Sequence, residues 1–102
     1  MDGLVAELMG RRTGASGGRG GSQHIGARGF YSSGVQGGML PAAAGMALAR
    51  KLAGRADIVA AVIGDGTLGE GVVYETLNIA AKWELPLLVV LENNLYAQST
   101  PQ

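Results

Sequence analysis

Two short apolar runs, one on each side of a helical segment, organise the second half of the chain. Residues 58–63, IVAAVI, are all apolar, and residues 87–91, LLVVL, form a second such run. Runs this short and this apolar predict strands that are buried on both faces, as in a parallel sheet. The residues between them, from about 70 to 84, predict a helix, which Pro86 ends. The pattern therefore predicts an α/β fold built on a βαβ unit, whose crossover is almost always right-handed.

The residues before this unit predict two further helices joined by a loop. Residues 41–52, PAAAGMALARKL, place Pro41 in a first helical turn and Gly54 at a C-terminal cap, and their small side chains let another backbone pack closely. Residues 4–9 predict a short helix that needs packing partners, because isolated helices of this length are unstable. Residues 11–22, RRTGASGGRGGS, predict a mobile loop.

Composition and charge bound the function classes. The chain has 102 residues with eight Lys plus Arg and eight Asp plus Glu, so its net charge gives no reason to expect nucleic acid or a membrane as a partner. It has no cysteine, which excludes disulfides and thiolate metal sites and fits a reducing, cytoplasmic setting. No apolar run approaches the roughly 20 residues of a membrane span, and we expect no signal peptide.

The glycines divide the sequence into two regions. Most of the eighteen glycines fall in the first third of the chain. We therefore expect one incomplete domain, in which residues 1–38 form a glycine-rich loop region with a short helix and residues 39–102 form the βαβ core.

A polar, glycine-rich loop follows the first predicted strand. Residues 64–69, GDGTLG, match the pattern G-x-G-x-x-G between a strand and a helix, and Glu92 follows the second strand. This combination is the fingerprint of a dinucleotide-binding module, in which Glu92 would hydrogen-bond the ribose hydroxyls. That interpretation leaves Asp65 and the asparagines at residues 93–94 without a role.

The same residues also fit a metal–diphosphate site. Ligands of open α/β sheets bind beyond the carboxyl ends of the strands, where this sequence puts Asp65 and Asn94. A carboxylate oxygen, an amide oxygen and a nearby backbone carbonyl are ligands that Mg²⁺ accepts, with phosphates and water completing its octahedron. The glycines let the backbone approach a diphosphate, and the helix that begins near Glu70 offers N–H groups at its positive dipole end. We favour this interpretation because it uses every polar residue at the strand ends.

Several separated blocks of the sequence resemble one enzyme family. The GDG at residues 64–66, a spacer of 26 residues and the following Asn-Asn are similar to the thiamin diphosphate motif. The longer stretch GDGTLGEGVVYETLNIAAKWELPLLVVLENNLYAQST resembles the alpha subunit of the thiamin diphosphate-dependent decarboxylating component of 2-oxo acid dehydrogenases, of the pyruvate, branched-chain and acetoin types. The blocks GRGGSQHI and GVQGGMLPAAAGMALA resemble further segments of that family in the same order. By this resemblance the chain is expected to be an internal piece of a longer subunit.

The resemblance implies a fold, an activity and partners. The fold would be part of a doubly wound parallel sheet, the thiamin diphosphate-binding fold. The activity would be oxidative decarboxylation of a 2-oxo acid by Mg²⁺–thiamin diphosphate, with transfer of the acyl group to a lipoyl carrier. The partners would be a beta subunit in an alpha2beta2 heterotetramer and a lipoyl-bearing acyltransferase. In the family the partner subunit supplies the carboxylate that activates the cofactor, so we expect no catalytic residue and no turnover from this chain alone. The location would be the cytoplasm in a bacterium or an organellar matrix in a eukaryote.

The resemblance also implies the site residues. The Mg²⁺ ligands would be Asp65, Asn94 and the backbone carbonyl of Tyr96. The carbonyl of Gly34 and the N–H of Gln36 would meet the aminopyrimidine ring, although family members often carry an aliphatic residue where this chain has Gln36. The residues implied to bind the cofactor are Gly34, Gln36, Gly64, Asp65, Gly66, Thr67, Asn94 and Tyr96.

Two features leave other roles open. His24 is the only histidine, and we favour a structural or hydrogen-bonding role because the histidines assigned to catalysis in the family lie in segments that this sequence lacks. The helix at residues 70–84 is apolar on more than one side, which predicts burial by more than its own sheet. Glu75 and Asn78 fit either an interface or solvent. A truncated, non-catalytic assembly partner therefore remains an alternative function, beside the dinucleotide-binding module.

Overall fold

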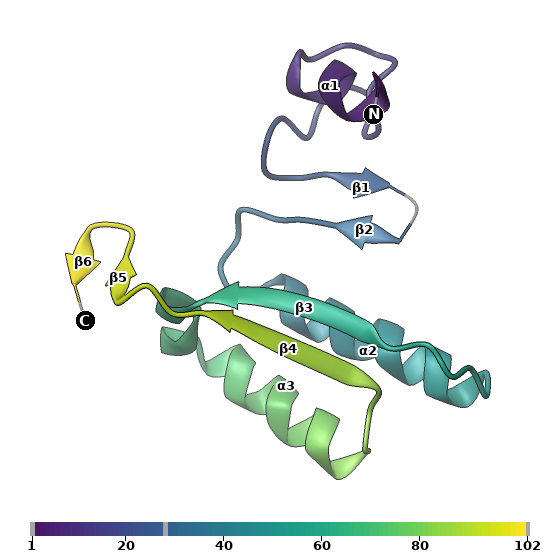
Figure 1. Ribbon diagram of the computed structural model, residues 1–102, viewed down its shortest axis with the longest axis vertical. Helices are drawn as coiled ribbons and strands as arrows, with labels where there is room; N and C mark the ends of the chain where they lie inside the picture. Colours follow the sequence, from purple (N-terminus) through teal and green to yellow (C-terminus); the bar gives the residue numbers. More distant parts are fainter. Residues whose placement is uncertain (1, 28, 102) are drawn as a thin grey trace. The chain divides into compact units, whose positions relative to one another are not determined.

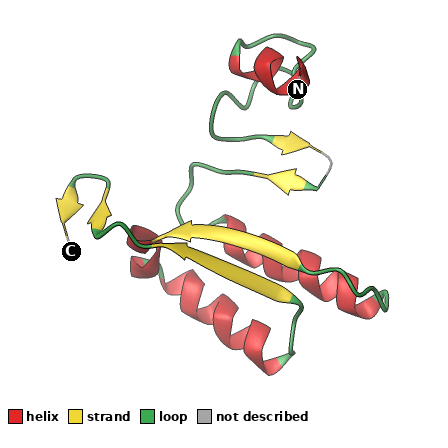
Figure 2. Ribbon diagram, viewed as in Figure 1, coloured by secondary structure: helices red, strands yellow, loops and turns green. Residues whose placement is uncertain are grey.

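The computed structural model describes residues 2–27 and 29–101. The chain divides into two compact units, Met1–Val35 and Gln36–Gln102. Each unit has its own helices and strands (Figure 2). Over the described ranges, no helix combines the length and the apolar character that a bilayer crossing requires.

The first unit consists of a short helix, a long loop and a small hairpin. Helix α1 (Asp2–Leu8) is followed by Gly10, whose φ of 65° is the left-handed conformation expected of a C-terminal cap. Strands β1 (Gly26–Ala27) and β2 (Phe30–Tyr31) pair in antiparallel orientation. The large apolar side chains of α1 are exposed, and the buried residue of the helix is Glu7. The packing partner that this short helix needs is therefore polar.

The carboxylate of Glu7 holds the loop that follows α1. It accepts hydrogen bonds from the backbone N–H groups of Ser16 (2.7 Å), Gly18 (2.8 Å) and Gly20 (2.6 Å), and its side chain is fully buried. Burial by itself raises the pKa of Glu7, but the backbone hydrogen bonds, with that of Gly18 the strongest, together outweigh it and hold the pKa below its ordinary value. The segment at residues 11–22, which the sequence predicts to be mobile, is thus tied to α1 over its second half.

Acidification is expected to release this loop. Because the folded-state pKa of Glu7 lies below the ordinary 4.5, the ionised carboxylate stabilises the loop above the unfolded-state pKa, and this contribution is lost as the pH falls through the lower folded-state value. Amide hydrogen exchange at Ser16, Gly18 and Gly20, corrected for the intrinsic rate, should show protection near neutral pH that is lost as the pH falls through the lowered pKa of Glu7. In a Glu7→Gln variant these amides should exchange at least about threefold faster near neutral pH and lose most of their pH dependence.

The exposed Glu75 of the second unit offers a matched control, because Glu75→Gln makes the same chemical change away from the loop. Its loop protection should equal that of the unsubstituted protein at every pH. Equal protection in the Glu7→Gln variant would contradict the role given to the Glu7 carboxylate.

The second unit contains the predicted βαβ arrangement (Figure 1). Strand β3 (Val59–Gly64) leads through a 3₁₀ helix, η1 (Asp65–Gly69), into helix α3 (Gly71–Lys82), and strand β4 (Leu87–Glu92) lies parallel to β3. The predicted unit is confirmed, with both strands extending one residue further toward the C-terminus than the apolar runs indicate. The glycine-rich loop adds one element that the sequence does not predict, the 3₁₀ turn.

Helix α2 (Met39–Leu52) packs against both strands and against α3. Its contact face is formed by Leu40 and by small residues, since Ala43, Ala44 and Ala47 are buried. Pro41 lies in the first turn, as predicted, because its missing N–H costs nothing there. The interpretation of close backbone approach is wrong at the helix's glycine, Gly45, which faces open space.

The parallel sheet of the second unit, formed by β3 and β4, has one covered face. Alternate positions along β3 and β4 differ in exposure, as the pleat of a strand requires. The half-buried side chains are Val59, Ala61, Ile63, Leu87 and Val89, and the exposed ones are Ala60, Val62, Leu88 and Val90. The prediction of strands buried on both faces is therefore not met in this chain, because these two strands carry a helical layer on one side. The structure gives an α/β arrangement with a small parallel sheet.

Helix α3 is also exposed on much of its surface. Val73 and Thr76 are its buried residues, whereas Tyr74 and Trp83 are at least half exposed. Glu75 and Asn78, for which the sequence left two roles open, are exposed in this chain. The sequence predicts that this helix is buried by more than its own sheet, because it is apolar on more than one side. Among the described residues, nothing covers its exposed apolar side chains.

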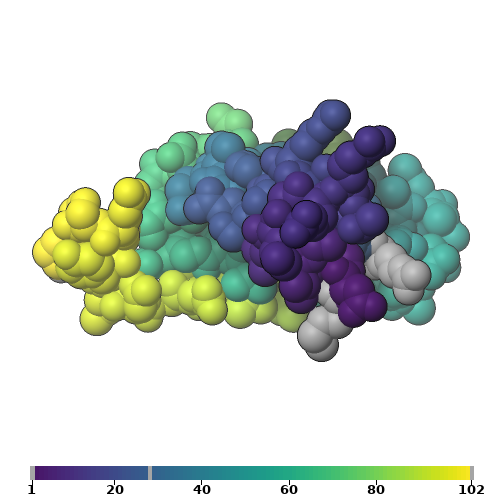
Figure 3. Space-filling view, turned by 90° about the horizontal axis from the view of Figure 1, so that it is seen from above, coloured from purple at the N-terminus to yellow at the C-terminus, as the bar shows by residue number. Residues whose placement is uncertain are grey.

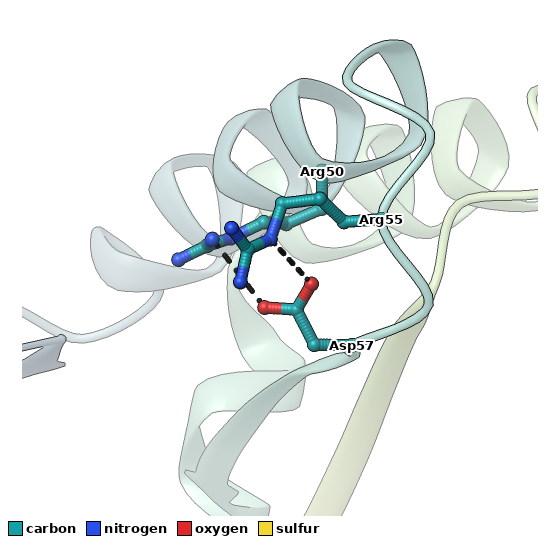
Figure 4. Close-up of polar contacts among 3 residues, drawn as sticks. All are labelled: Arg50, Arg55 and Asp57. Atoms are coloured by element: carbon teal, nitrogen blue, oxygen red, sulfur yellow. Dashed lines mark hydrogen bonds and ion pairs between the residues drawn. The ribbon is translucent and has the colours of Figure 1, made fainter.

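Ionic contacts gather at the edge of the sheet where β3 begins. Arg50 lies 3.3 Å and Arg55 2.8 Å from the two carboxylate oxygens of Asp57 (Figure 4). The hydrogen bond from Arg55 lowers the pKa of Asp57. All three side chains are well exposed, so these pairs contribute little to stability.

Candidate functional site

The carboxyl ends of β3 and β4 lie at the same edge of the sheet. Gly64, the last residue of β3, pairs with Glu92, the last residue of β4. Asp65 and the asparagines at residues 93–94 come directly after these ends. The register therefore brings together the two segments that carry the predicted metal ligands, at the edge where ligands of α/β folds bind.

A cavity of about 280 Å³ lies at this edge. It is open to solvent and is lined by residues of η1, by the end of β4 and by strand β5 (Tyr96–Ala97), which forms a hairpin with β6 (Thr100–Pro101). Figure 3 shows this C-terminal segment in yellow, continuous with the yellow-green atoms of β4. The lining residues are Gln36, Gly64, Asp65, Gly66, Glu92, Asn94, Tyr96, Ala97 and Gln98.

Most of the cofactor-binding residues implied by the resemblance are in or next to this cavity. Thr67 does not line it but hydrogen-bonds Gln36, which does. Gly34 belongs to the first unit, so its predicted contact with the cofactor stays a prediction. Within the second unit, the structure therefore gathers the residues assigned to the metal and the diphosphate.

The cavity is electronegative. Asp65 is only 8% exposed, and Glu92 adds a second carboxylate, while the lining contains no Lys, Arg or His. Both ion pairs of the described residues involve Asp57, so no basic side chain neutralises Asp65. A diphosphate would be repelled from such a cavity unless a cation lay between the two, because like charges at short range destabilise one another strongly in a partly buried site.

The two asparagines shape the chain that closes the cavity. Asn93 Oδ1 accepts the N–H of Leu95 (3.1 Å), and Asn94 Oδ1 accepts the N–H of Tyr96 (2.9 Å). Leu95 has a φ of 64°, the left-handed conformation of a turn residue, and the β5 strand that follows contacts η1. An amide oxygen has two lone pairs, so Asn94 Oδ1 retains one for a cation while it holds this turn.

The turn packs directly onto the loop that carries Asp65. A Cβ atom on Gly66 would lie 2.7 Å from the Cβ of Ala97, closer than such atoms approach in proteins. Glycine is thus required here, because β5 lies against η1. This contact fixes the distance between Asp65 and the segment that holds Asn94 and Tyr96.

The donor set fits a hard divalent cation. Asp65 offers a carboxylate oxygen, Asn94 an amide oxygen and Tyr96 a backbone carbonyl, all of the oxygen type that Mg²⁺ prefers. Among residues 2–27 and 29–101 there is no cluster of three or more His, Cys, Asp or Glu, so a zinc-type site has no support in this part of the chain. The cavity has room beside these donors for phosphate oxygens and water.

Two further polar residues singled out in the sequence have local roles in the structure. His24 is in the first unit, where its Nδ1 is 3.4 Å from the Ser33 hydroxyl, a contact that fits a hydrogen-bonding role. Glu70 is the N-cap residue of α3, in extended conformation, and its side chain does not cap the helix.

Three contributions to the site escape sequence reasoning. Ala97 and Gln98 line the cavity, and the side chain of Gln36 hydrogen-bonds Thr67. Ala97 and Gln98 follow the asparagines closely in the sequence, so their position just after a turn could have indicated that they lie near the site. The pairing of Gln36 with Thr67 joins residues 31 positions apart, and no local pattern indicates it.

Comparison with known proteins places the chain among enzyme subunits. Residues 1–102 match the family model for the dehydrogenase E1 component. The chain is 42% identical over 98 residues to the somatic, mitochondrial pyruvate dehydrogenase E1 component subunit alpha of Bos taurus, and 41% identical to that of Homo sapiens. It is 43% identical to the human testis-specific form. Each match covers 95% of this chain and 25% of the relative, so the chain spans about a quarter of the length of the curated relatives it matches.

Proposed function

The chain belongs to the dehydrogenase E1 component family, and we propose that it binds the Mg²⁺–thiamin diphosphate of a 2-oxo acid dehydrogenase in the cavity at the ends of β3 and β4. The main support for this proposal is that Asp65, Asn94 and Tyr96 line the same electronegative cavity. Carboxylates without basic partners favour a cation, and a cation in turn favours a diphosphate.

The proposed metal ligands are Asp65, Asn94 and the backbone carbonyl of Tyr96. Asp65 supplies the negative charge, and its place directly after β3 fixes it at the sheet edge. Asn94 holds the turn through the Tyr96 N–H, and this bond limits where the Tyr96 carbonyl can lie. The three donors belong to two segments that the Gly66–Ala97 contact keeps together.

The proposed diphosphate segment is the glycine-rich loop itself. Gly64 and Gly66 line the cavity without side chains, and the next residue, Thr67, is buried. Helix α3 begins at Gly71, and the N–H groups of its first turn add a positive dipole end near this loop. The aminopyrimidine contacts of Gly34 and Gln36 remain part of the proposal.

The proposed reaction is oxidative decarboxylation of a 2-oxo acid with transfer of the acyl group to a lipoyl carrier. When bound, thiamin diphosphate supplies the nucleophile and the electron sink for such chemistry. The residues of this chain bind and orient the cofactor, and none is proposed as an acid, base or nucleophile. The proposed partners are a beta subunit, in an alpha2beta2 assembly, and a lipoyl-bearing acyltransferase. The compared relatives are mitochondrial, which is compatible with an organellar matrix as the alternative to a cytoplasmic setting.

A dinucleotide-binding module is the second candidate, and one observation favours it. Glu92 ends the strand beside β3 and lines the cavity, where an acid that binds ribose hydroxyls would lie. Against it, Asp65 places an uncompensated carboxylate in the same cavity, which opposes a pyrophosphate that arrives without a metal ion.

Calorimetric titration of the chain with thiamin diphosphate, in Mg²⁺ and again in excess chelator, tests the proposal. We expect saturable binding in Mg²⁺ and an affinity at least about tenfold weaker in chelator, because the described lining residues include no basic side chain to offset the phosphates. A parallel titration with NAD covers the second candidate. Metal-independent NAD binding would replace the proposal with the dinucleotide module, and equal thiamin diphosphate binding with and without Mg²⁺ would remove the metal from it.

A further inference from the structure

The side chains of Gln36 and Thr67 join the two segments that flank the cavity. The Thr67 hydroxyl donates a hydrogen bond to Gln36 Oε1. Thr67 belongs to η1, directly after Asp65 and Gly66, and Gln36 lies three residues before α2. Within the described part of the second unit, this is the one hydrogen bond between uncharged side chains.

The Thr67 end of this contact is fixed by burial. Thr67 is 3% exposed, and its carbonyl accepts the N–H of Glu70 (3.0 Å) at the start of α3. A buried hydroxyl without a partner is costly, so the Thr67 side chain is committed to the acceptor that the structure gives it. That acceptor is a single side-chain oxygen that no other described donor shares.

The Gln36 end is fixed through the next residue. Gly37 is buried with a φ of 71°, and a Cβ atom there would lie 3.0 Å from Val72 Cγ1 and 3.3 Å from the Cβ of Glu70. The backbone beside Gln36 is therefore pressed against the first turn of α3. Gln36 itself is exposed and lines the cavity, so the hydrogen bond to Thr67 decides how its side chain lies there.

We infer that the Gln36–Thr67 hydrogen bond is a latch that holds the segment entering α2 against the Asp65 loop, and that Gln36 is thereby a positioning residue for the metal-bound diphosphate. With Oε1 committed to Thr67, the amide nitrogen of Gln36 is left as a neutral hydrogen-bond donor beside a cavity that otherwise carries two carboxylates. The inference rests on the proposed function and adds a residue pair that acts through side chains.

A double-mutant cycle in the full chain tests the latch. Gln36→Leu removes the acceptor, Thr67→Val removes the donor, and both should weaken binding of thiamin diphosphate in Mg²⁺ by about three- to tenfold. The double variant should be no weaker than the worse single variant, because the second substitution removes nothing that is still formed. Thr67→Ser keeps the hydroxyl and should restore affinity to within about twofold.

Thr76→Val is the matched control. Thr76 is another buried threonine of the second unit, and its hydroxyl donates to the backbone carbonyl of Val72 (2.7 Å) within α3. This variant makes the same chemical change and should lower thermal stability without changing affinity for the cofactor. A loss of affinity that merely followed stability would appear here as well and would overturn the positioning role.

A ligand-free measurement separates failure of the latch from failure of the proposed function. Hydrogen exchange of the amides at residues 66–70 should be at least about threefold faster in Thr67→Val and Gln36→Leu than in the unsubstituted chain. If the unsubstituted chain binds no thiamin diphosphate, the proposed function is wrong, and the exchange data still decide whether the latch forms. Unchanged exchange, or additive losses of affinity in the double variant, would overturn the latch.

Discussion

Replacing Asp65 by asparagine is expected to raise the Kd of thiamin diphosphate in Mg²⁺ by more than about 100-fold. Asparagine keeps the size of the side chain and one of its two oxygens, replaces the other with an NH₂ group and removes the charge. Asp65 is the one charged residue of the proposed ligand set, and among the described residues no basic side chain forms an ion pair with it or lines the cavity. Without that charge the cavity holds the cation weakly, and the diphosphate loses the cation that offsets its own charge. Isothermal titration in Mg²⁺, repeated at several Mg²⁺ concentrations, measures the loss.

Glu92 provides the matched carboxylate in the same cavity. Glu92→Gln should leave Mg²⁺-dependent affinity within about threefold, because Glu92 is outside the proposed ligand set. In a dinucleotide module the larger loss of affinity would instead occur in Glu92→Gln, because Glu92 would be the acid that binds the ribose, and Asp65→Asn would have the smaller effect. A large loss in Glu92→Gln together with a small one in Asp65→Asn would therefore contradict the metal site.

The sequence predicts the strand ends well because their logic is local. Apolar runs of five or six residues give β3 and β4, and parallel strands must end at a common edge, which places Asp65 and Asn94 together. The same runs mislead about burial, since Val62 and Leu88 carry the pattern of a fully covered strand and are exposed. An apolar run indicates that both faces of a strand can be buried, but in this chain helices cover only one face of the sheet.

Contacts between distant positions are what the sequence could not indicate. Glu7 appears in a short, largely apolar helix, where a carboxylate is normally exposed, and its burial depends on loop N–H groups more than nine residues away. Gly66 matches a phosphate-loop glycine, and the structure adds a second reason why a glycine is needed there: any side chain would collide with Ala97 of β5. In both cases the constraint comes from backbone that returns from elsewhere in the chain, so periodicity and motif spacing contain no trace of it.

Replacing Gly66 by alanine is expected to separate the two halves of the proposed metal site. The new Cβ would lie 2.7 Å from the Cβ of Ala97, an atom fixed directly to the backbone of β5, so the backbone itself must move. Overpacking of this kind costs about 1–3 kcal/mol in stability. The movement carries Asn94 and Tyr96 away from Asp65, so affinity for thiamin diphosphate in Mg²⁺ should fall by more than about tenfold. Thermal unfolding and the same titration measure the two effects.

A compensating substitution makes this prediction specific. Ala97→Gly removes the opposing Cβ and leaves the Ala97 Cα, at 3.5 Å, as the nearest atom to the new side chain, which is an ordinary contact. The double variant should therefore recover most of the lost affinity, although Ala97→Gly alone slightly destabilises the β5–β6 hairpin. Gly69→Ala, with nothing within 4 Å of the added Cβ, is the control for inserting alanine into η1 and should bind normally. If Gly66→Ala lost affinity and Ala97→Gly failed to restore it, the contact with β5 would not be what makes Gly66 necessary, and close approach of the diphosphate to the loop would become the better explanation.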